Sequence, residues 1–66
     1  SEYGVLTIEE VAEILKVDPK TVYRLIGNNE LTAFKVGRVY RVTQEDFLTF
    51  LKKAKEKVVN APQKKY

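Results

Sequence analysis

The sequence predicts a small, mainly α-helical domain that also contains one two-stranded antiparallel β-hairpin. Two segments with helical periodicity, each preceded by a capping residue, lie between Ile8 and Ile26. Two short apolar segments then flank Gly37, and a third helical segment follows them. The chain has 66 residues and no cysteine, so we expect a single domain over residues 1–59 that packing alone must stabilise.

The first helix is expected from Ile8 to Leu15, after a loose lead-in from Ser1 to Val5. Thr7 and Glu10 match the capping box, in which the Thr hydroxyl accepts from a backbone N–H and the Glu reaches back to the N–H of the cap. Apolar side chains then recur at i, i+3, i+4 and i+7: Ile8, Val11, Ala12 and Leu15. This stripe predicts the buried face of the helix.

A second helix is expected directly after the short link Lys16-Val17. Asp18 is a strong N-cap residue, and Pro19 suits the first helical position. The inward stripe consists of Val22, Leu25 and Ile26. Lys20 and Arg24 lie on the opposite side of this helix. Two helices joined by so short a link, the second with a basic outer face, form the helix-turn-helix pattern.

Gly27-Asn28-Asn29 is expected to end the second helix, because Gly or Asn can adopt the left-handed C-cap conformation. Leu31 is expected to return to the core. A third helix should begin after a cap at Thr43, with this apolar stripe: Phe47, Phe50, Leu51, Ala54 and Val58. Its outer face is expected to be solvated: Lys52, Lys53, Lys55 and Lys57. Residues 60–66 are expected to form a disordered tail.

The hairpin has two possible registers. A two-residue loop, Gly37-Arg38, pairs Val36 with Val39. A three-residue loop, Gly37-Arg38-Val39, pairs Val36 with Tyr40 instead. A shift of one residue moves every side chain of a strand to the other face, so the apolar pattern should decide between them.

The three-residue loop is predicted because it gathers four apolar side chains on one face: Phe34, Val36, Tyr40 and Val42. It also leaves Lys35 and Arg41 together on the other face, with Arg38 at the tip. The two-residue loop would bring Arg41 onto the same face as Phe34 and Val36.

Charge is distributed unevenly along the chain. Residues 1–18 sum to −4, residues 19–41 to +4 and residues 42–66 to +3. Such asymmetry gives an anionic partner a preferred orientation, although an ordinary solvated surface would also account for it.

Residues suited to catalysis are scarce. The chain has no histidine and no cysteine, and carboxylate pairs such as Glu9/Glu10 have structural duties at helix ends. It has neither a Gly-rich phosphate loop nor the spacing of a metal site. We therefore expect no enzyme activity, cofactor or metal. No apolar run approaches the ~18 residues of a membrane span, and the amino end lacks a signal-peptide pattern, so we expect a cytoplasmic protein.

The basic residues of the middle segment are candidates for contacts with duplex DNA. A helix in the major groove presents its amino-terminal half to the bases, where Lys20 and Arg24 could meet guanine O6 and N7. Thr21 and Tyr23 could add contacts to phosphates or to base edges. Thr21 could instead only support the Asp18 cap, and Tyr23 could be a half-buried edge of the core. The hairpin residues would lie over the backbone or the neighbouring minor groove: Lys35, Arg38 and Arg41.

Specific motifs cover most of the chain: an L-T-x-x-E-x-A-x-x-L opening, a T-V-Y-R-L helix and a K-V-G-R-x-Y-R hairpin followed by EDF. On these motifs, Leu6 to Leu51 resembles the excisionase-type helix-turn-helix domains, relatives of the MerR winged-helix fold. The resemblance implies a winged helix, with the second helix in the major groove and the hairpin as a wing. The family's DNA-contacting positions would fall on Lys20, Thr21, Tyr23, Arg24, Lys35, Arg38 and Arg41.

Two positions depart from the family pattern: Asp18 stands where Ser is common, and Asn28-Asn29 replaces a Lys/Ser-Gly turn. Members act as recombination directionality factors or as transcription regulators, which implies a recombinase or further copies of the chain as partners. Without an effector domain or a long dimerising helix, we expect no small-molecule effector. The alternative is a protein-interaction module without nucleic-acid binding. It would dock through the Lys face of the third helix or, if the three-residue register is wrong, through exposed Tyr40 and Phe34.

Overall fold

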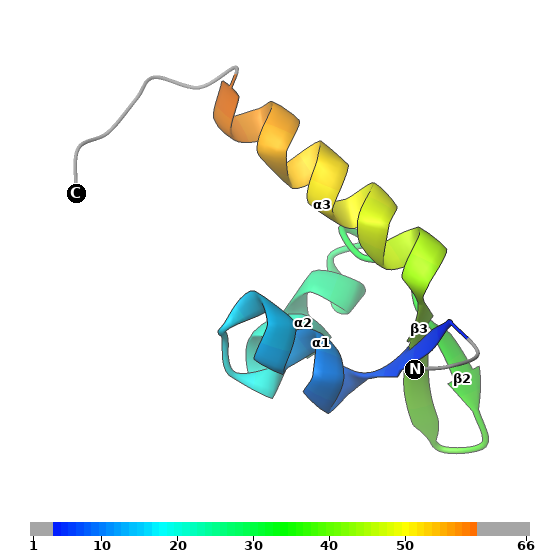
Figure 1. Cartoon of the computed structure of the whole chain (residues 1–66). Helices are drawn as coiled ribbons and strands as arrows, with labels where there is room; N and C mark the ends of the chain where they lie inside the picture. The colour runs from blue at the N-terminus through cyan, green and yellow to red at the C-terminus, as the bar shows by residue number, and fades with distance from the viewer. Residues whose placement is uncertain (1–3, 60–66) are drawn as a thin grey trace.

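A computed structural model describes residues 4–59, within which three helices and three short strands form one layer of helices beside a small sheet (Figure 1). In chain order the elements are β1 (Val5–Thr7), α1 (Ile8–Leu15), α2 (Pro19–Gly27), β2 (Phe34–Val36), β3 (Val39–Thr43) and α3 (Gln44–Val59). The three predicted helices are confirmed. The predicted tail, residues 60–66, and the side chain of Val58 lie outside the described residues.

Each helix begins at its predicted cap. The hydroxyl of Thr7 accepts from the N–H of Glu10 (3.0 Å), and the Glu10 carboxylate accepts from the N–H of Thr7 (2.8 Å), which completes the capping box. The Asp18 carboxylate accepts from the N–H of Lys20 (2.8 Å). Thr43 caps α3 through its hydroxyl, 3.0 Å from the N–H three residues on. These local bonds satisfy backbone donors that the first turn of a helix leaves free.

The two short helices end on left-handed residues. Lys16 caps α1 with φ 61°, a position that the sequence did not reveal. At the end of α2, Gly27 is still helical, Asn28 is the C-cap and Asn29 takes the left-handed conformation with φ 60°. The prediction that Gly27-Asn28-Asn29 ends α2 is therefore confirmed, and Asn29 is the residue in the left-handed conformation.

The sheet has a third strand that the sequence interpretation missed. Its order is β1-β3-β2, with both pairs antiparallel, so β3 is central. Leu6 of β1 pairs with Val42 of β3, and both side chains are buried. The N–H of Gln44 also donates to the carbonyl of Gly4 (2.8 Å). The lead-in predicted for Ser1 to Val5 is thus wrong at Val5, which belongs to β1.

The hairpin adopts the two-residue loop, so the predicted three-residue register is wrong. Val36 pairs with Val39 across Gly37 and Arg38. Gly37 has φ 63°, whereas Arg38 has no positive φ, the arrangement of a type II′ turn. Turn chemistry and the pairing of β3 with β1 set this register. The sheet already buries Leu6 against the core, so β2 need not supply apolar side chains.

Two consequences follow from this register. Phe34, Val36 and Val39 remain exposed, at 41%, 57% and 45%. Lys35 pairs with Tyr40, and Phe34 pairs with Arg41. Because side chains alternate along a strand, Lys35 shares the face of Tyr40, and Arg41 lies on the opposite face. The predicted grouping of Lys35 with Arg41 is therefore also wrong.

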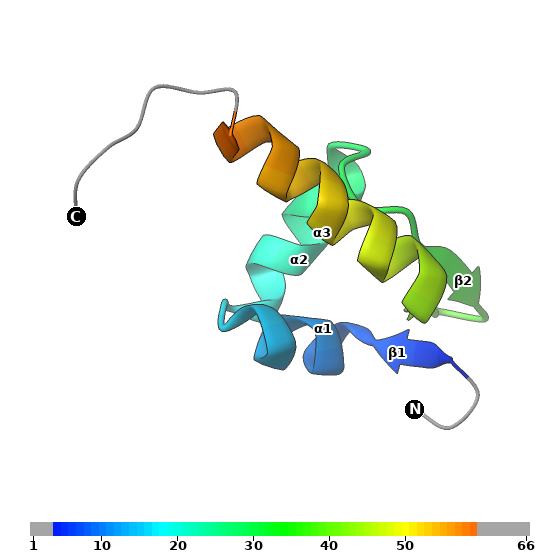
Figure 2. The ribbon, with the colours of Figure 1, turned by 45° about the horizontal axis from the view of Figure 1, so that its top comes forward.

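The core draws on every element except β2. Its buried side chains are Leu6, Ile8, Val11, Ala12, Val22, Leu31, Val42 and Phe47. The return of Leu31 to the core and the buried stripe of α1 are confirmed. Leu15, Leu25, Ile26, Tyr40, Phe50 and Leu51 are partly buried around this cluster. Figure 2 shows α3 running from the sheet across the end of α2, and Phe47 of α3 is one of the buried core residues.

Replacing Gly37 by alanine is expected to destabilise the domain by about 1–2 kcal/mol. A Cβ there meets no atom within 4 Å, so the cost arises from the left-handed φ alone. Gly27→Ala is the matched control, because Gly27 is helical and equally open. It should be neutral or stabilising by up to about 1 kcal/mol. Urea unfolding measures both changes, and equal effects would contradict the turn assignment.

Candidate nucleic-acid interface

The helix α2 presents two cations on its solvent side. Val22 is fully buried and fixes the rotation of the helix, so that Lys20 and Arg24 are exposed. The first turn contains no acidic residue, and Asp18 precedes it as the cap. Lys20 lies in the first turn, beside the positive end of the helix dipole, and Arg24 lies in the last turn. An anion approaching α2 would meet Lys20 at its start and Arg24 one turn further on.

A chain of side-chain contacts joins α2 to the hairpin. The rings of Tyr23 and Tyr40 meet edge to face, with centroids 6.1 Å apart and planes at 69°. The ammonium of Lys35 lies 5.4 Å from the centroid of the Tyr40 ring, within the range of a cation–π interaction. Lys35 is thereby held on the α2 side of the hairpin. This arrangement depends on the observed register, which places Lys35 and Tyr40 opposite each other.

Tyr40 is the residue of this site that the sequence interpretation missed. It correctly predicted that Tyr40 lies beside Val42 on the core face. It wrongly predicted that Val36 and Phe34 share this face, because the residue of β2 that pairs with Tyr40 is Lys35. The useful signal was the Gly37-Arg38 pair, since Gly at the first central position of a two-residue loop is typical of a type II′ turn. That signal would have placed Tyr40 opposite Lys35.

The remaining candidate residues differ in exposure and in position. Arg38 is exposed at the tip of the hairpin. Thr21 is half-buried, and its N–H donates to the carbonyl of Asp18 (2.9 Å). Tyr23 is exposed despite its ring contact, so it is not a core residue. Five of the seven predicted contact residues are thus brought to α2 and the face of the hairpin joined to it: Lys20, Thr21, Tyr23, Arg24 and Lys35.

Arg41 is placed differently from the sequence prediction. It is half-buried on the far face of the hairpin, opposite Phe34 on one side and Thr7 on the other. Its Nη1 donates to the carbonyl of Tyr40 (2.8 Å). Its charge is also close enough to the Glu10 carboxylate to favour the ionised form of that group. Arg41 therefore already interacts within the chain, with the carbonyl of Tyr40 and with the charge of Glu10.

The pKa of the Glu10 carboxyl lies below its ordinary value of 4.5. The main cause is the hydrogen bond from the backbone N–H of Thr7, which stabilises the carboxylate. The Thr7 hydroxyl and the charge of Arg41 act in the same direction, and partial desolvation acts against them. A lowered pKa in the folded state means that the ionised capping box favours folding.

Stability is therefore expected to decrease as the pH falls below about 4.5, through the lowered pKa of Glu10. The contribution is fully present above the pKa of the unfolded chain and is lost on protonation. Glu10→Gln should keep a capping hydrogen bond while removing this part of the pH dependence. Glu9→Gln removes the same charge from the same turn without altering the bond to Thr7. Thermal unfolding between about pH 3 and pH 6 compares the variants, and identical pH profiles for both would contradict the assignment.

Other charged groups complete the description of the surface. Lys52, Lys53 and Lys55 are exposed on α3, as predicted. The ammonium of Lys57 lies 3.5 Å from the carboxylate of Glu30, a pair that joins α3 to the turn after α2. Within residues 4–59, no group of three or more His, Cys, Asp or Glu side chains could hold a metal ion. No helix in that range combines the length and the apolar character needed to cross a membrane.

Comparisons with known proteins point to one family. A family model described as a helix-turn-helix domain matches residues 5–55. Two Mycobacterium tuberculosis proteins named "Putative DNA-binding protein", from strains CDC 1551 / Oshkosh and H37Rv, are each 54% identical over 37 residues. That alignment covers 56% of this chain and 47% of each relative, so the chain spans about half their length.

A protein of Bacillus subtilis strain 168, "Uncharacterized protein YvgK", is 52% identical over 46 residues, which is 70% of this chain and 15% of that protein. No solved structure matches the chain. The family match extends from β1 into α3 and so includes both α2 and the hairpin. This chain belongs to the helix-turn-helix domain family.

Proposed function

We propose that this domain binds duplex DNA sequence-specifically, with α2 in the major groove and the hairpin as a wing on the adjacent backbone or minor groove. The observation that carries the proposal is the Tyr23–Tyr40–Lys35 contact, because it holds the cation of the hairpin beside the cationic helix. The helix-turn-helix family match and the names of the mycobacterial relatives support the same activity.

Each candidate contact residue has a role in this proposal. Lys20, in the first turn of α2, and Arg24, one turn further along the same exposed side, reach base edges, where Arg or Lys can donate to guanine O6 and N7. Thr21 and the Tyr23 hydroxyl donate to phosphates and set the position of α2. The hairpin cations Lys35 and Arg38 neutralise phosphates or enter the minor groove. Arg41, on the far face, contributes least.

The biological role we propose is that of a recombination directionality factor or a transcription regulator, without enzyme activity or a cofactor. Both roles begin with recognition of a short duplex site. A single domain of this size offers a small interface, so useful specificity would come from further copies or from a recombinase bound beside it.

The salt dependence of binding tests the proposal. If four or five phosphates are neutralised, the affinity for a mixed-sequence duplex should fall by about four decades for each decade of salt. Fluorescence anisotropy with a labelled duplex, between about 50 and 200 mM salt, measures this slope. Lys35→Ala should reduce the slope by about one unit, whereas Lys55→Ala on α3 should not change it. Absence of binding at the lowest salt concentration would overturn the proposal.

A further inference from the structure

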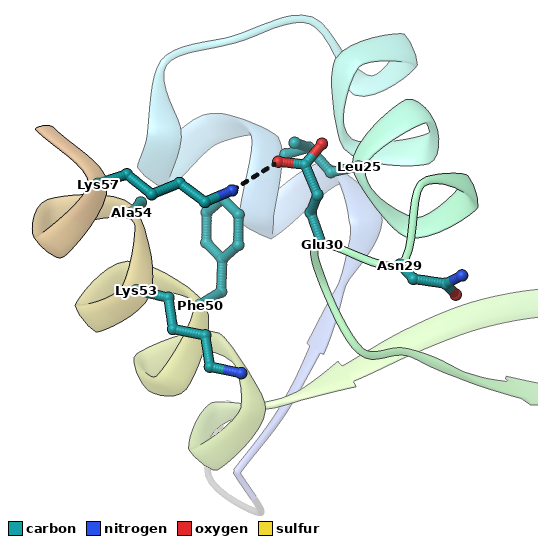
Figure 3. A pocket seen from close by; sticks show the side chains of 7 residues that line it. All are labelled: Leu25, Asn29, Glu30, Phe50, Lys53, Ala54 and Lys57. Atoms are coloured by element: carbon teal, nitrogen blue, oxygen red, sulfur yellow. Dashed lines mark hydrogen bonds and ion pairs between the residues drawn. The ribbon is translucent and has the colours of Figure 1, made fainter. Parts of the chain in front are cut away.

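A groove lies between the end of α2 and the carboxyl-terminal half of α3 (Figure 3), and none of the proposed DNA-contacting residues lines it. Its volume is about 360 Å³, at the lower end of the range of about 300–1,000 Å³ that is usual for ligand pockets. The lining residues are Leu25, Asn29, Glu30, Phe50, Lys53, Ala54 and Lys57. One wall therefore comes from α2 and the turn that follows it, and the other comes from α3.

The α3 wall has a regular pattern. Phe50, Lys53, Ala54 and Lys57 follow one another at i, i+3, i+4 and i+7, so they form one face of the helix. Phe50 and Ala54 are partly buried and form an apolar floor with Leu25, whereas Lys53 and Lys57 are exposed at the rim. The groove thus combines an apolar base with two ammonium groups one helical turn apart.

The rim already binds a carboxylate within this chain. Glu30 reaches across the groove to the ammonium of Lys57 at 3.5 Å, as the dashed line in Figure 3 shows. The partner of Lys57 is thus a carboxylate above an apolar floor. Lys53 lines the same rim, and within residues 4–59 its ammonium has no ion-pair or hydrogen-bond partner. A ligand that complements the groove would therefore carry an apolar side chain and, about one helical turn away, a carboxylate.

The groove also lies away from the proposed DNA-binding surface. At about 100° per residue, Leu25 points about 160° away from Tyr23 around the axis of α2. Tyr23 faces the hairpin through its contact with Tyr40, so Leu25 and the groove lie on the other flank of the helix. Lys20 and Arg24 project between these flanks. A ligand in the groove would leave both cations free.

We propose that this groove is a docking site for an acidic amphipathic helical segment of a partner protein. A large apolar side chain of that segment enters above Phe50 and Ala54, and a carboxylate one turn away pairs with Lys53. This mode is helix-in-groove recognition with a cationic rim. The inference goes beyond DNA binding and does not depend on it.

The test uses a short synthetic helical peptide with Leu and Phe on one face and glutamates elsewhere. Lys53→Glu should weaken its binding at least about tenfold, because the rim charge is reversed at the point of contact. Lys52→Glu makes the same charge change on the neighbouring exposed residue, which does not line the groove, and should alter the affinity by less than about twofold. A scrambled peptide of the same composition controls for charge alone, and thermal unfolding confirms that both variants fold.

Amide chemical shifts identify the contact surface. The proposal is supported if the amide shifts on peptide addition are centred on Leu25, Phe50 and Ala54, and if only the Lys53→Glu variant loses affinity for the peptide. Equal losses for both variants, equal binding of the scrambled peptide or absence of binding would overturn it. So would shifts of the groove residues on addition of duplex DNA instead of peptide, because the lysines would then be nucleic-acid contacts. Duplex binding by Lys20 and Arg24 is measured separately, so failure of the groove proposal leaves the DNA proposal standing.

Discussion

Replacing Phe47 by alanine is expected to leave most of the protein unfolded at 25 °C. Phe47 is 5% exposed and is the side chain of α3 that belongs to the buried core. Truncating a buried Phe to Ala typically costs about 3–5 kcal/mol. A core in a domain of fewer than about 70 residues rarely supplies more than about 3–5 kcal/mol in total. The loss therefore matches the whole expected stability.

The neighbouring Leu48 provides the control. It lies on the same turn of α3 but is 63% exposed, so Leu48→Ala should change the free energy of unfolding by no more than about 0.5 kcal/mol. Circular dichroism with urea titration measures the stable variant, and amide NMR dispersion reports whether Phe47→Ala retains a packed fold. A cooperative unfolding transition at wild-type urea concentration for Phe47→Ala would show that α3 does not close the core.

The substitution with the largest expected effect on DNA binding is Arg24→Ala. Under the proposed docking, Arg24 contacts base edges, and loss of such a contact costs about 1–3 kcal/mol, or roughly tenfold to a hundredfold in affinity. The preference for the selected site should decrease more than affinity for unrelated duplex. Selection of bound sites from a random duplex pool, followed by anisotropy on the selected and a shuffled duplex, separates these two effects.

Two arginines of the hairpin give a matched comparison for the same assay. Arg38→Ala removes an exposed cation at the tip and should weaken all sequences alike. Arg41→Ala removes the same side chain from the far face, where it already bonds the carbonyl of Tyr40, and should affect binding less. If Arg41→Ala weakened binding more than Arg38→Ala, the duplex would lie against the other face of the sheet.

The helices were predictable because local signals set them. The Thr7–Glu10 capping box, Asp18-Pro19 and Thr43 each specify a helix start through bonds within a few residues. The apolar stripe of α1 and the position of Leu31 in the core needed only periodicity and chain length. The exposure of Lys20 and Arg24 was predicted from helical periodicity as well, because both residues lie opposite the inward stripe of α2.

The sheet was not predictable to the same degree, because its register depends on a distant segment. The three-residue loop gathers the apolar side chains of the hairpin on one face, and this favours it only if the hairpin strands are the whole sheet. β1 supplies Leu6 to the buried face of β3, so Val36 and Phe34 are not needed there. Because register sets the face of every side chain, one missed strand also misplaced Lys35 relative to Arg41.

The contact between Tyr23 and Tyr40 has a consequence for target length. Both rings come from elements anchored in the core, through Val22 in α2 and Val42 in β3, so the hairpin and α2 move as one body. If α2 and the hairpin bind one duplex as proposed, a constant number of base pairs separates the bases that α2 contacts from the phosphates that the hairpin contacts. An inserted base pair within a site would then have to be absorbed by overtwisting or bending of the duplex, at an elastic cost borne by the DNA.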